Sequence, residues 1–436
     1  MRQNLSIDEA LEDARAHYVD RRPKSLAAHE AACRHLPGGN TRTVLFHGPF
    51  PFRAERGEGS ALFDIDGHRY VNLLGEYTAG VFGHSHPAIR RAIDRALEVG
   101  LNLGAHNMAE ARLAALVVER FSAIDSVRFT NSGTEANLMA ISTARYATGR
   151  EKVLVFDGGY HGGLLYFGGG GIPINAPFPY VVATFNDLAA TRSLIRENAA
   201  DLACIIVEPM LGSGGCIPGD ARFLEMLREE ASASGAMLIF DEVMTSRFGR
   251  GGAHTALGIA PDLVTLGKWV GGGMSFGAFG GNRSPMAIYD PTAEHAIPHA
   301  GTFNNNTLSM HAGIAAMTEA FTADAALQLH ETGERFRGRA NAVFERHGVA
   351  LSLSGTGSLM NLHGVAGPVR TLDDLQGNDE RAKELLFLDL LERGYYIARR
   401  GFIALSTALG DEELDGFLAA LDEIVALRKP LIAKRP

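Results

Sequence analysis

Lys268 lies in a glycine-rich stretch, "PDLVTLGKWVGGGMSFGAFGG" at residues 261–281, with seven glycines between Gly267 and Gly281. The lysine ends an apolar run that the pattern predicts to be a strand. Because glycine has no side chain, such a segment lets another group approach the backbone closely. The first hypothesis is therefore a bulky ligand that lies against the backbone and meets one amine. A strand that ends in a solvated lysine is the alternative.

Two carboxylates, Asp241 and Glu242, directly follow another apolar run in "LIFDEV". Ligands of open α/β sheets bind at the carboxyl ends of strands, so we expect both side chains to reach a crevice there. The next predicted strand ends at Lys268, which would bring an acid and an amine to one edge of the sheet. A plain salt bridge between them is an alternative that the spacing does not exclude.

A strand-to-helix transition in "RFTNSGTEANLMA" could bind an anion, because a helix is predicted to begin near Gly133. Ser132 followed three residues later by Glu135 fits a capping box, which is a purely structural explanation. The same helix start offers Ser132, Gly133 and Thr134, with free N–H groups, hydroxyls and the positive end of the helix dipole. These groups suit a phosphate, and both interpretations stay open at this point.

Three further motifs bear on function. Tyr160 in "VFDGGYHGG" follows a predicted strand and is flanked by glycines, so its ring is free to stack on a flat ligand. Thr302 adds a hydroxyl in the polar loop "GTFNNNTLSM". The pair His84 and His86 in "GHSHP" is best explained as a turn before a helix, and no metal site is predicted. No GxGxxG follows a strand, and "GKW" lacks the Ser or Thr of a P-loop.

The elements that would position these residues alternate between strands and helices from about 105 to 285. Continuous apolar runs indicate strands buried on both faces, as in a parallel sheet covered by helices. The fold class expected is α/β, with a mostly parallel sheet. The apolar runs are "SVRFT", "KVLVF", "ACIIVEP", "AMLIFDE", "DLVTLG" and "SFGAFGG", and helical spacing covers residues 108–121, 133–148, 187–198 and 220–234.

The two ends of the chain predict a second, smaller α+β domain. Residues 6–35 have helical spacing, and residues 60–74 alternate around an Asp-Gly turn, which is the signal of a β-hairpin. After about 325 the pattern is helical, then strand-like, then helical again. We expect residues 1–75 to be an N-terminal segment of the small domain, 76–325 to be the large domain, and 326–436 to be the C-terminal small domain.

Composition excludes several classes of function. The chain has 436 residues and a formal net charge of −9, which argues against a nucleic-acid partner. Three cysteines without a CxxC pair suit a reducing compartment. The charged N-terminus lacks the apolar core of a signal peptide, and no segment approaches the ~18 apolar residues of a membrane span. A cytoplasmic protein without membrane contact is expected.

Taken together, these stretches resemble the class III pyridoxal-phosphate aminotransferases, which have the fold-type-I architecture. The resemblance covers residues 60–325 and is closest to the glutamate-1-semialdehyde aminomutase-like subgroup. Within that subgroup, "TRTVLFHGPFP" and "ARRGFIALS" look most like β-amino-acid (β-phenylalanine) aminotransferases. The motifs that carry the resemblance, in the family's order, are "NSGTEAN", "GGYHG", "VEPM", "FDEVMTSRFG", "TLGKWVGGGMSFGAFGG" and "GTFNNN".

The resemblance implies a role for each candidate residue toward pyridoxal 5'-phosphate. Lys268 would hold the cofactor aldehyde as an internal Schiff base and later move a proton between substrate and cofactor carbons. Asp241 would pair with the pyridine nitrogen, and Thr302 would reach the phosphate of a neighbouring subunit, which implies a homodimer with shared active sites. The remaining cofactor contacts would be ring packing by Val243 and Tyr160, phosphate binding by Ser132, Gly133 and Thr134, and support of the ring environment by Glu208.

Two arginines are the candidates for substrate carboxylates, because a guanidinium can bind a carboxylate bidentately. Arg42 lies near apolar and aromatic residues that would suit an aromatic or aliphatic side chain, and Arg400 is the second candidate. For Arg400, as for its neighbour Arg399, a surface ion pair is the alternative. The residues expected to surround the substrate with Arg42 are Val44, Phe46, Phe50, Phe52 and Tyr77.

The function expected is a ping-pong transaminase that moves an amino group from a β-amino acid to 2-oxoglutarate or pyruvate. Three alternatives stay open. One is an intramolecular aminomutase acting on a glutamate-semialdehyde-like molecule, and another is an ω-amine:keto-acid transaminase. The third is a cofactor-binding protein without catalysis.

Overall fold

The chain divides into two compact units in the computed structural model, which describes residues 6–433. The first unit comprises the described parts of Met1–Ser85, Thr332–Val369 and Asp373–Pro436. The second comprises His86–Glu331 and Arg370–Leu372. The units therefore separate after Ser85 and Glu331. The boundaries predicted from the sequence were after residues 75 and 325.

A seven-stranded sheet forms the centre of the second unit, in the order β4-β12-β11-β10-β7-β5-β6. Neighbouring strands are parallel from β11 to β6, whereas β12 is antiparallel to both β11 and β4. Every residue of β7, β10 and β11 is buried, which explains their continuous apolar sequences. The strands are β4 (Ser126–Thr130), β5 (Lys152–Phe156), β6 (Tyr180–Ala183), β7 (Leu202–Val207), β10 (Met237–Asp241), β11 (Leu263–Gly267) and β12 (Gly277–Gly281).

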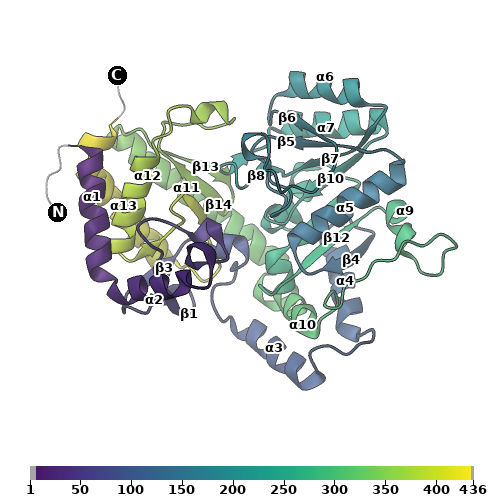
Figure 1. The fold of residues 1–436 in the computed structure, drawn as a ribbon, viewed down its shortest axis with the longest axis horizontal. Coiled ribbons are helices and arrows are strands. Elements are labelled where there is room, and N and C mark those ends of the chain that lie inside the picture. The colour runs from purple at the N-terminus through teal and green to yellow at the C-terminus, as the bar shows by residue number, and fades with distance from the viewer. Residues whose placement is uncertain (1–5, 434–436) are drawn as a thin grey trace. The chain divides into compact units, whose positions relative to one another are not determined.

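Helices cover this sheet and confirm the four helices predicted from spacing. Figure 1 shows α5 crossing the sheet in front of its strands, α6 and α7 side by side near β5 and β6, and α3 beside α10. His86 accepts a hydrogen bond from Ala88 N at 3.3 Å and caps α3, as the turn-before-helix explanation predicted. The helices are α3 (Pro87–Val99), α4 (Met108–Arg120), α5 (Gly133–Thr148), α6 (Leu188–Asn198), α7 (Ala221–Ser234), α8 (Gly252–Leu257), α9 (Arg283–Met286) and α10 (Thr307–Ala315). A short hairpin, β8 (Met210–Leu211) with β9 (Ile217–Pro218), completes the unit.

The glycines of the 267–281 stretch accommodate close neighbours from the protein itself. A Cβ on Gly277 would collide with Ser132 O and the Thr130 hydroxyl, and a Cβ on Gly272 would collide with Ala312. Gly272 also has a φ of +67°, which a side chain rarely tolerates. The close approaches at these two positions are therefore internal packing, which the sequence pattern did not distinguish from the approach of a ligand.

The first unit contains two small sheets and the terminal helices. One sheet has the order β1-β2-β3-β15, in which β2 and β3 form the predicted hairpin, and the other has the order β13-β14-β16. The helical spacing predicted for residues 6–35 forms two helices, because Pro23 occupies the first position of a new helix. The elements are α1 (Ile7–Arg21), α2 (Pro23–Cys33), α11 (Ala323–His347, which begins in the second unit), α12 (Glu380–Glu392), α13 (Asp411–Ile432), β1 (Ala54–Glu58), β2 (Ala61–Asp64), β3 (Arg69–Asn72), β13 (Ser352–Thr356), β14 (Leu359–His363), β15 (Tyr395–Tyr396) and β16 (Phe402–Ala404).

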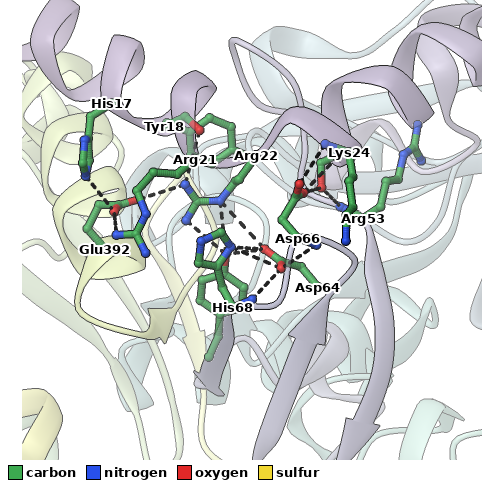
Figure 2. Close-up of polar contacts among 12 residues, drawn as sticks. His17, Tyr18, Arg21, Arg22, Lys24, Arg53, Asp64, Asp66, His68 and Glu392 are labelled. Atoms are coloured by element: carbon green, nitrogen blue, oxygen red, sulfur yellow. Dashed lines mark hydrogen bonds and ion pairs between the residues drawn. The ribbon is translucent and has the colours of Figure 1, made fainter.

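A buried polar network around Arg22 joins the terminal helices to the hairpin of the first unit (Figure 2). Arg22 Nε donates to Tyr70 Oη at 3.1 Å, and Arg22 Nη1 donates to Glu392 Oε1 at 2.8 Å. Tyr70 Oη in turn donates to Asp64 Oδ2 at 2.6 Å. Asp66, in the hairpin turn, accepts from the first backbone N–H groups of α2. These hydrogen bonds link α1, α2 and α12 to β2 and β3.

Within 6–433, no helix is long and apolar enough to cross a bilayer. The same part of the chain contains no group of three or more His, Cys, Asp or Glu side chains that could hold a metal ion.

Candidate active site

Asp241 ends β10 and is buried, and its carboxylate accepts several hydrogen bonds. Its Oδ2 accepts from His161 Nδ1 and from Asn137 Nδ2, each at 2.8 Å. Its Oδ1 accepts from Val243 N at 3.0 Å. Donors of this kind stabilise the ionised form of a carboxylate and fix its orientation. The structure therefore presents a fixed, buried carboxylate at the carboxyl end of a central strand, where α/β sheets bind ligands.

His161 and Asn137 are functional candidates that the sequence analysis missed. Both contact Asp241, and Asn137 Nδ2 also donates to His161 O at 3.0 Å. His161 Nε2 is buried and has no hydrogen-bond partner among residues 6–433. Both residues lie inside motifs named above, "GGYHG" and "NSGTEAN". Their place in these motifs could have identified them as candidates from the sequence.

Glu242 does not share the environment of Asp241, so the expectation that both carboxylates reach one crevice was wrong. The Glu242 side chain is fully buried and accepts from Ala253 N at 2.7 Å and His254 N at 2.8 Å. It also accepts from His254 Nδ1 at 2.7 Å. Successive residues of a strand point to opposite faces, which places Glu242 against the start of α8. Glu242 is a structural group.

Lys268 follows β11 directly and begins a short 3₁₀ turn, Lys268–Gly271. Its φ is +55°, a left-handed conformation that residues other than glycine rarely adopt. Trp269, fully buried, anchors this turn by donating from Nε1 to Ser246 Oγ at 3.0 Å. Strained backbone of this kind persists only where the surroundings hold it, and it is concentrated at functional sites.

The backbone of Lys268 and that of Asp241 lie on adjacent parallel strands. Asp241 pairs with Thr265 in the register of β10 and β11. Lys268 is therefore three residues beyond the position beside Asp241, an offset of roughly 10 Å along the strand. The two predicted groups come from one edge of the sheet, as the sequence analysis expected.

The start of α5 has the geometry of an anion site as well as a helix cap. Ser132 is the N-cap, and its Oγ accepts from Glu135 N at 3.2 Å. Glu135 Oε2 accepts from Asn131 N at 2.6 Å, one residue earlier than the predicted capping box would have it. Thr134 Oγ1 accepts from Gly163 N at 3.3 Å. The first N–H groups of a helix have no partner within the helix and face an anion-attracting end of the dipole.

Tyr160 lies at the turn after β5, and Glu208, beyond the end of β7, holds its backbone. Glu208 Oε2 accepts from Tyr160 N at 2.9 Å, and its Oε1 accepts from Gly212 N at 3.1 Å. The Tyr160 ring is partly exposed and lies 5.9 Å from the Tyr166 ring in an edge-on arrangement. Burial raises the pKa of Glu208 to about 7, and the nearby Asp241 charge acts in the same direction.

Val243 and Thr302 occupy different surroundings in the second unit. Val243 methyl groups lie close to Gly133 and Gly267, since a Cβ on either glycine would come within 3.0–3.2 Å of them. Thr302 is on an exposed loop beside an open cavity of about 470 Å³, which residues 102–106, Thr302 and Asn305 line. This loop is tied to the residue before the α5 N-cap, because Asn131 Nδ2 donates to Asn304 Oδ1 at 2.9 Å.

The substrate candidates Arg42, Val44, Tyr77 and Arg400 belong to the first unit. Tyr77 Oη donates to Val44 O at 2.9 Å, and the Arg400 guanidinium lies 5.1 Å from the centroid of the Tyr77 ring. Arg42 is exposed and its charge acts on the Tyr77 hydroxyl. The structure thus places Val44 and Arg400 in contact with Tyr77, and Arg42 lies two residues before Val44 in the chain.

Two of the aromatic residues expected around Arg42 lie elsewhere. Phe50 is buried with its ring 5.3 Å from that of Tyr18, and Phe52 stacks on Tyr70 at 4.9 Å. Phe50 packs inside the first unit, so the expectation that it lines a substrate site was wrong, whereas Phe52 is partly buried. Val44 and Phe46 remain exposed.

The neighbours Arg399 and Arg400 have different partners. Arg399 Nη2 donates to Glu384 Oε2 at 2.7 Å, which is the ion pair considered in the sequence analysis. Arg400 lies over the rings of Tyr77 and Phe402. A planar guanidinium can stack on aromatic faces and also bind a carboxylate bidentately.

The chain is similar to known proteins in sequence and in fold. Residues 46–366 match the family model "Aminotransferase class-III". A β-phenylalanine transaminase of Variovorax paradoxus is 50% identical over 97% of both chains. A glutamate-1-semialdehyde 2,1-aminomutase of Methanosphaera stadtmanae is 36% identical over 93% of this chain and 98% of its own. A crystal structure of a β-phenylalanine aminotransferase from V. paradoxus superposes with a TM-score of 0.97 and 49% identity, covering 99% of this chain and 100% of that one.

Proposed function

The chain belongs to the class III aminotransferases, and we propose that it transfers the amino group of a β-amino acid, such as β-phenylalanine, to a keto acid. As a member of this family it is a transaminase with the fold-type-I architecture, and it takes an amino donor and a keto acid acceptor. Its cofactor is pyridoxal phosphate. Two observations support this donor. Tyr77 contacts both Arg400 and Val44, which lies two residues after Arg42, and the chain is 50% identical to a β-phenylalanine transaminase.

The described residues of the second unit fit pyridoxal phosphate. The start of α5, with Ser132, Gly133 and Thr134, suits the phosphate group. The carboxylate of Asp241 is fixed by His161 and Asn137 and suits a protonated ring nitrogen. Val243 and Tyr160 would pack on the ring, and Glu208 would hold Tyr160 in place through its backbone N–H.

The chemistry assigned to each residue follows from its position. Pyridoxal phosphate supplies an electron sink for the bond broken at the carbon that carries the amino group. Lys268 Nζ would hold the cofactor aldehyde covalently until a substrate amine displaces it. The freed amine of Lys268 would then take a proton from the substrate carbon and return it on the cofactor side. Asp241 would keep the proton on the ring nitrogen throughout, because a buried carboxylate stabilises the adjacent positive charge.

The two arginines would recognise the carboxylate of the substrate. Arg400 has its guanidinium stacked on Tyr77 and Phe402, and Arg42 lies on the exposed segment beside Val44. Two guanidinium groups would allow the site to bind the carboxylates of two substrates in succession. One substrate is a β-amino acid, and the other is a keto acid such as 2-oxoglutarate or pyruvate. Val44 and Tyr77 would contact the apolar part of the donor.

We also propose a homodimer in which Thr302 contacts the phosphate held by the partner. Thr302 lies on an exposed loop beside the cavity lined by residues 102–106. Large apolar side chains are exposed in the same segments, which is unusual for a free surface and typical of one that a second copy covers. These side chains are Leu101, Leu103, Met108 and Phe303, between 46% and 85% exposed. A cytoplasmic location is proposed on the three free cysteines.

The proposed function is tested with purified holoenzyme and three substrate sets. β-Phenylalanine with 2-oxoglutarate or pyruvate should give glutamate or alanine, and omission of the keto acid should stop turnover. An aminomutase would instead convert glutamate 1-semialdehyde without any added keto acid. An ω-amine transaminase would use 1-phenylethylamine, which lacks a carboxylate, at least as well as β-phenylalanine. Conversion of glutamate 1-semialdehyde without a keto acid would contradict a β-amino acid as the donor. Use of 1-phenylethylamine at least as well as β-phenylalanine would contradict it too.

A further inference from the structure

A strained turn presents Tyr77 to the two arginines. Three successive residues other than glycine have left-handed backbone: Glu76 at φ +50°, Tyr77 at φ +53° and Thr78 at φ +81°. Side chains make this conformation unfavourable, so three in a row require support from the surrounding structure. An outlier of this size points to a functional constraint on the residue in the middle of the turn.

Asn72 provides much of that support. Its Oδ1 accepts from Leu74 N at 3.0 Å and from Gly75 N at 3.2 Å, and its Nδ2 donates to Glu76 Oε1 at 2.6 Å. Asn72 Nδ2 also lies 3.0 Å from His84 Nε2. The turn is therefore held from one side by a single buried amide that contacts three consecutive residues.

The Tyr77 side chain contacts both arginine-bearing segments. Its hydroxyl donates to Val44 O at 2.9 Å, two residues after Arg42. Its ring stacks on Phe402 at 5.2 Å, and the Arg400 guanidinium lies over both rings, at 5.1 Å and 5.6 Å. Burial raises the pKa of Tyr77, so the hydroxyl stays protonated and able to donate at neutral pH.

We propose that Tyr77 is a positioning residue that sets the spacing of Arg42 and Arg400 for carboxylate recognition, through its hydrogen bond to Val44 and the stacking of Arg400 on its ring. The inference rests on the proposed function, because it assigns those two arginines to a substrate carboxylate. Tyr77 acts through them: the hydroxyl limits where the Arg42 segment can lie, and the ring limits the rotamers of Arg400. Loss of the hydroxyl should therefore weaken carboxylate binding without altering the steps that Lys268 carries out.

The test is the affinity of the holoenzyme for 3-phenylpropionate, which has the skeleton of β-phenylalanine without its amine. Isothermal titration calorimetry would compare wild type with Tyr77→Phe, which keeps the ring under Arg400. Tyr289→Phe is the matched control, because it also removes a buried tyrosine hydroxyl bonded at 2.7 Å, to Thr143 in the second unit. 3-Phenylpropanamide has the same skeleton but no carboxylate charge, so its affinity measures the binding that does not depend on that charge.

Tyr77→Phe should bind 3-phenylpropionate about five-fold more weakly, the size expected when one hydrogen bond is lost. Tyr289→Phe should bind it as wild type does, and the amide should not distinguish the three proteins. The inference would be overturned if Tyr77→Phe bound 3-phenylpropionate as tightly as wild type does, or if Tyr289→Phe lost as much affinity for it as Tyr77→Phe. It would also be overturned if Tyr77→Phe lost as much affinity for the amide as for the acid. Failure of wild type to bind 3-phenylpropionate would also overturn it. Failure of the proposed function is a separate observation: wild type would bind this acid but would not turn over β-phenylalanine.

Discussion

His161 Nδ1 lies 2.8 Å from Asp241 Oδ2, and both side chains are buried. Asn137 donates to the same carboxylate oxygen at the same distance. The buried carboxylate is thus oriented by two side chains from two other segments, one after β5 and one in α5. These two hydrogen bonds hold the Asp241 carboxylate in one orientation toward a ligand.

Asp241→Asn should lower kcat of the holoenzyme by roughly 10²–10³-fold, the range seen when one preorganised electrostatic group is removed. The amide has the size of the carboxylate but cannot keep a proton on the ring nitrogen. Glu242→Gln is the matched control, because Glu242 is adjacent but caps α8. It should reduce the free energy of unfolding by roughly 3 kcal/mol and leave kcat of the folded protein within about twofold. A loss of kcat in Glu242→Gln as large as in Asp241→Asn would remove the special role of Asp241.

Arg400→Ala should raise KM for β-phenylalanine by about ten-fold or more, because a bidentate contact to the carboxylate is lost. Turnover of 1-phenylethylamine, which has no carboxylate, should change far less. Arg399→Ala is the control, since Arg399 pairs with Glu384 instead. Its KM for β-phenylalanine should stay near that of wild type. Equal effects of the two variants on both substrates would show that neither arginine reads the carboxylate.

Gly277→Ala should weaken pyridoxal phosphate binding by about ten-fold and lower the free energy of unfolding by roughly 1–3 kcal/mol. The added methyl would collide with Ser132 O at the start of α5 and displace the proposed phosphate site. Gly338→Ala is the control, because that glycine is exposed in α11 and a Cβ there meets open space. It should stabilise the protein by roughly 0.5–1 kcal/mol and leave cofactor affinity unchanged. Fluorescence titration of the apoenzyme with cofactor measures both variants, and an unchanged affinity in Gly277→Ala would contradict the prediction.

Glu208 should make the stability of the protein depend on pH. Burial raises the pKa of Glu208 from 4.5 to about 7, so the folded state favours the protonated carboxyl. That contribution to stability is fully present below about pH 4.5 and is lost as the pH rises through about 7. Glu208→Gln cannot titrate, so its Tm relative to wild type should rise by roughly 2–5 °C between pH 5 and pH 8. A difference in Tm that stays constant or falls over this interval would show that Glu208 is ionised throughout.

The strands and helices near the site were largely readable from sequence, because continuous apolar runs and helical spacing leave few alternatives. The runs ending at Thr130, Phe156, Asp241 and Gly267 all form strands. The direction of β12 was not readable, since "GAFGG" does not distinguish parallel from antiparallel pairing. The edge strand β6 was missed because its apolar run, "YVVA", has only four residues, of which Ala183 alone is buried.

Side-chain direction is the part of the site that sequence could not supply. Asp241 and Glu242 are equivalent in sequence, yet one faces His161 and the other faces α8. Phe50 and Phe52 were grouped with Arg42 by proximity in sequence, but the Phe50 ring packs against Tyr18 and the Phe52 ring stacks on Tyr70. The role of Tyr77 depends on three successive residues with left-handed backbone conformation, which no sequence motif predicts. The roles of the cofactor and substrate residues stay predictions until the variants above are measured.

The most direct test of the central claim is the visible absorption spectrum of the purified holoenzyme, recorded before and after β-phenylalanine is added without a keto acid. The yellow band of the cofactor bound to Lys268 should give way to the spectrum of pyridoxamine phosphate, and Lys268→Ala should not show this conversion. That result would establish the cofactor, the lysine and a β-amino acid donor together. A yellow band that persists in wild type after the addition would contradict the assignment of a β-amino acid as donor.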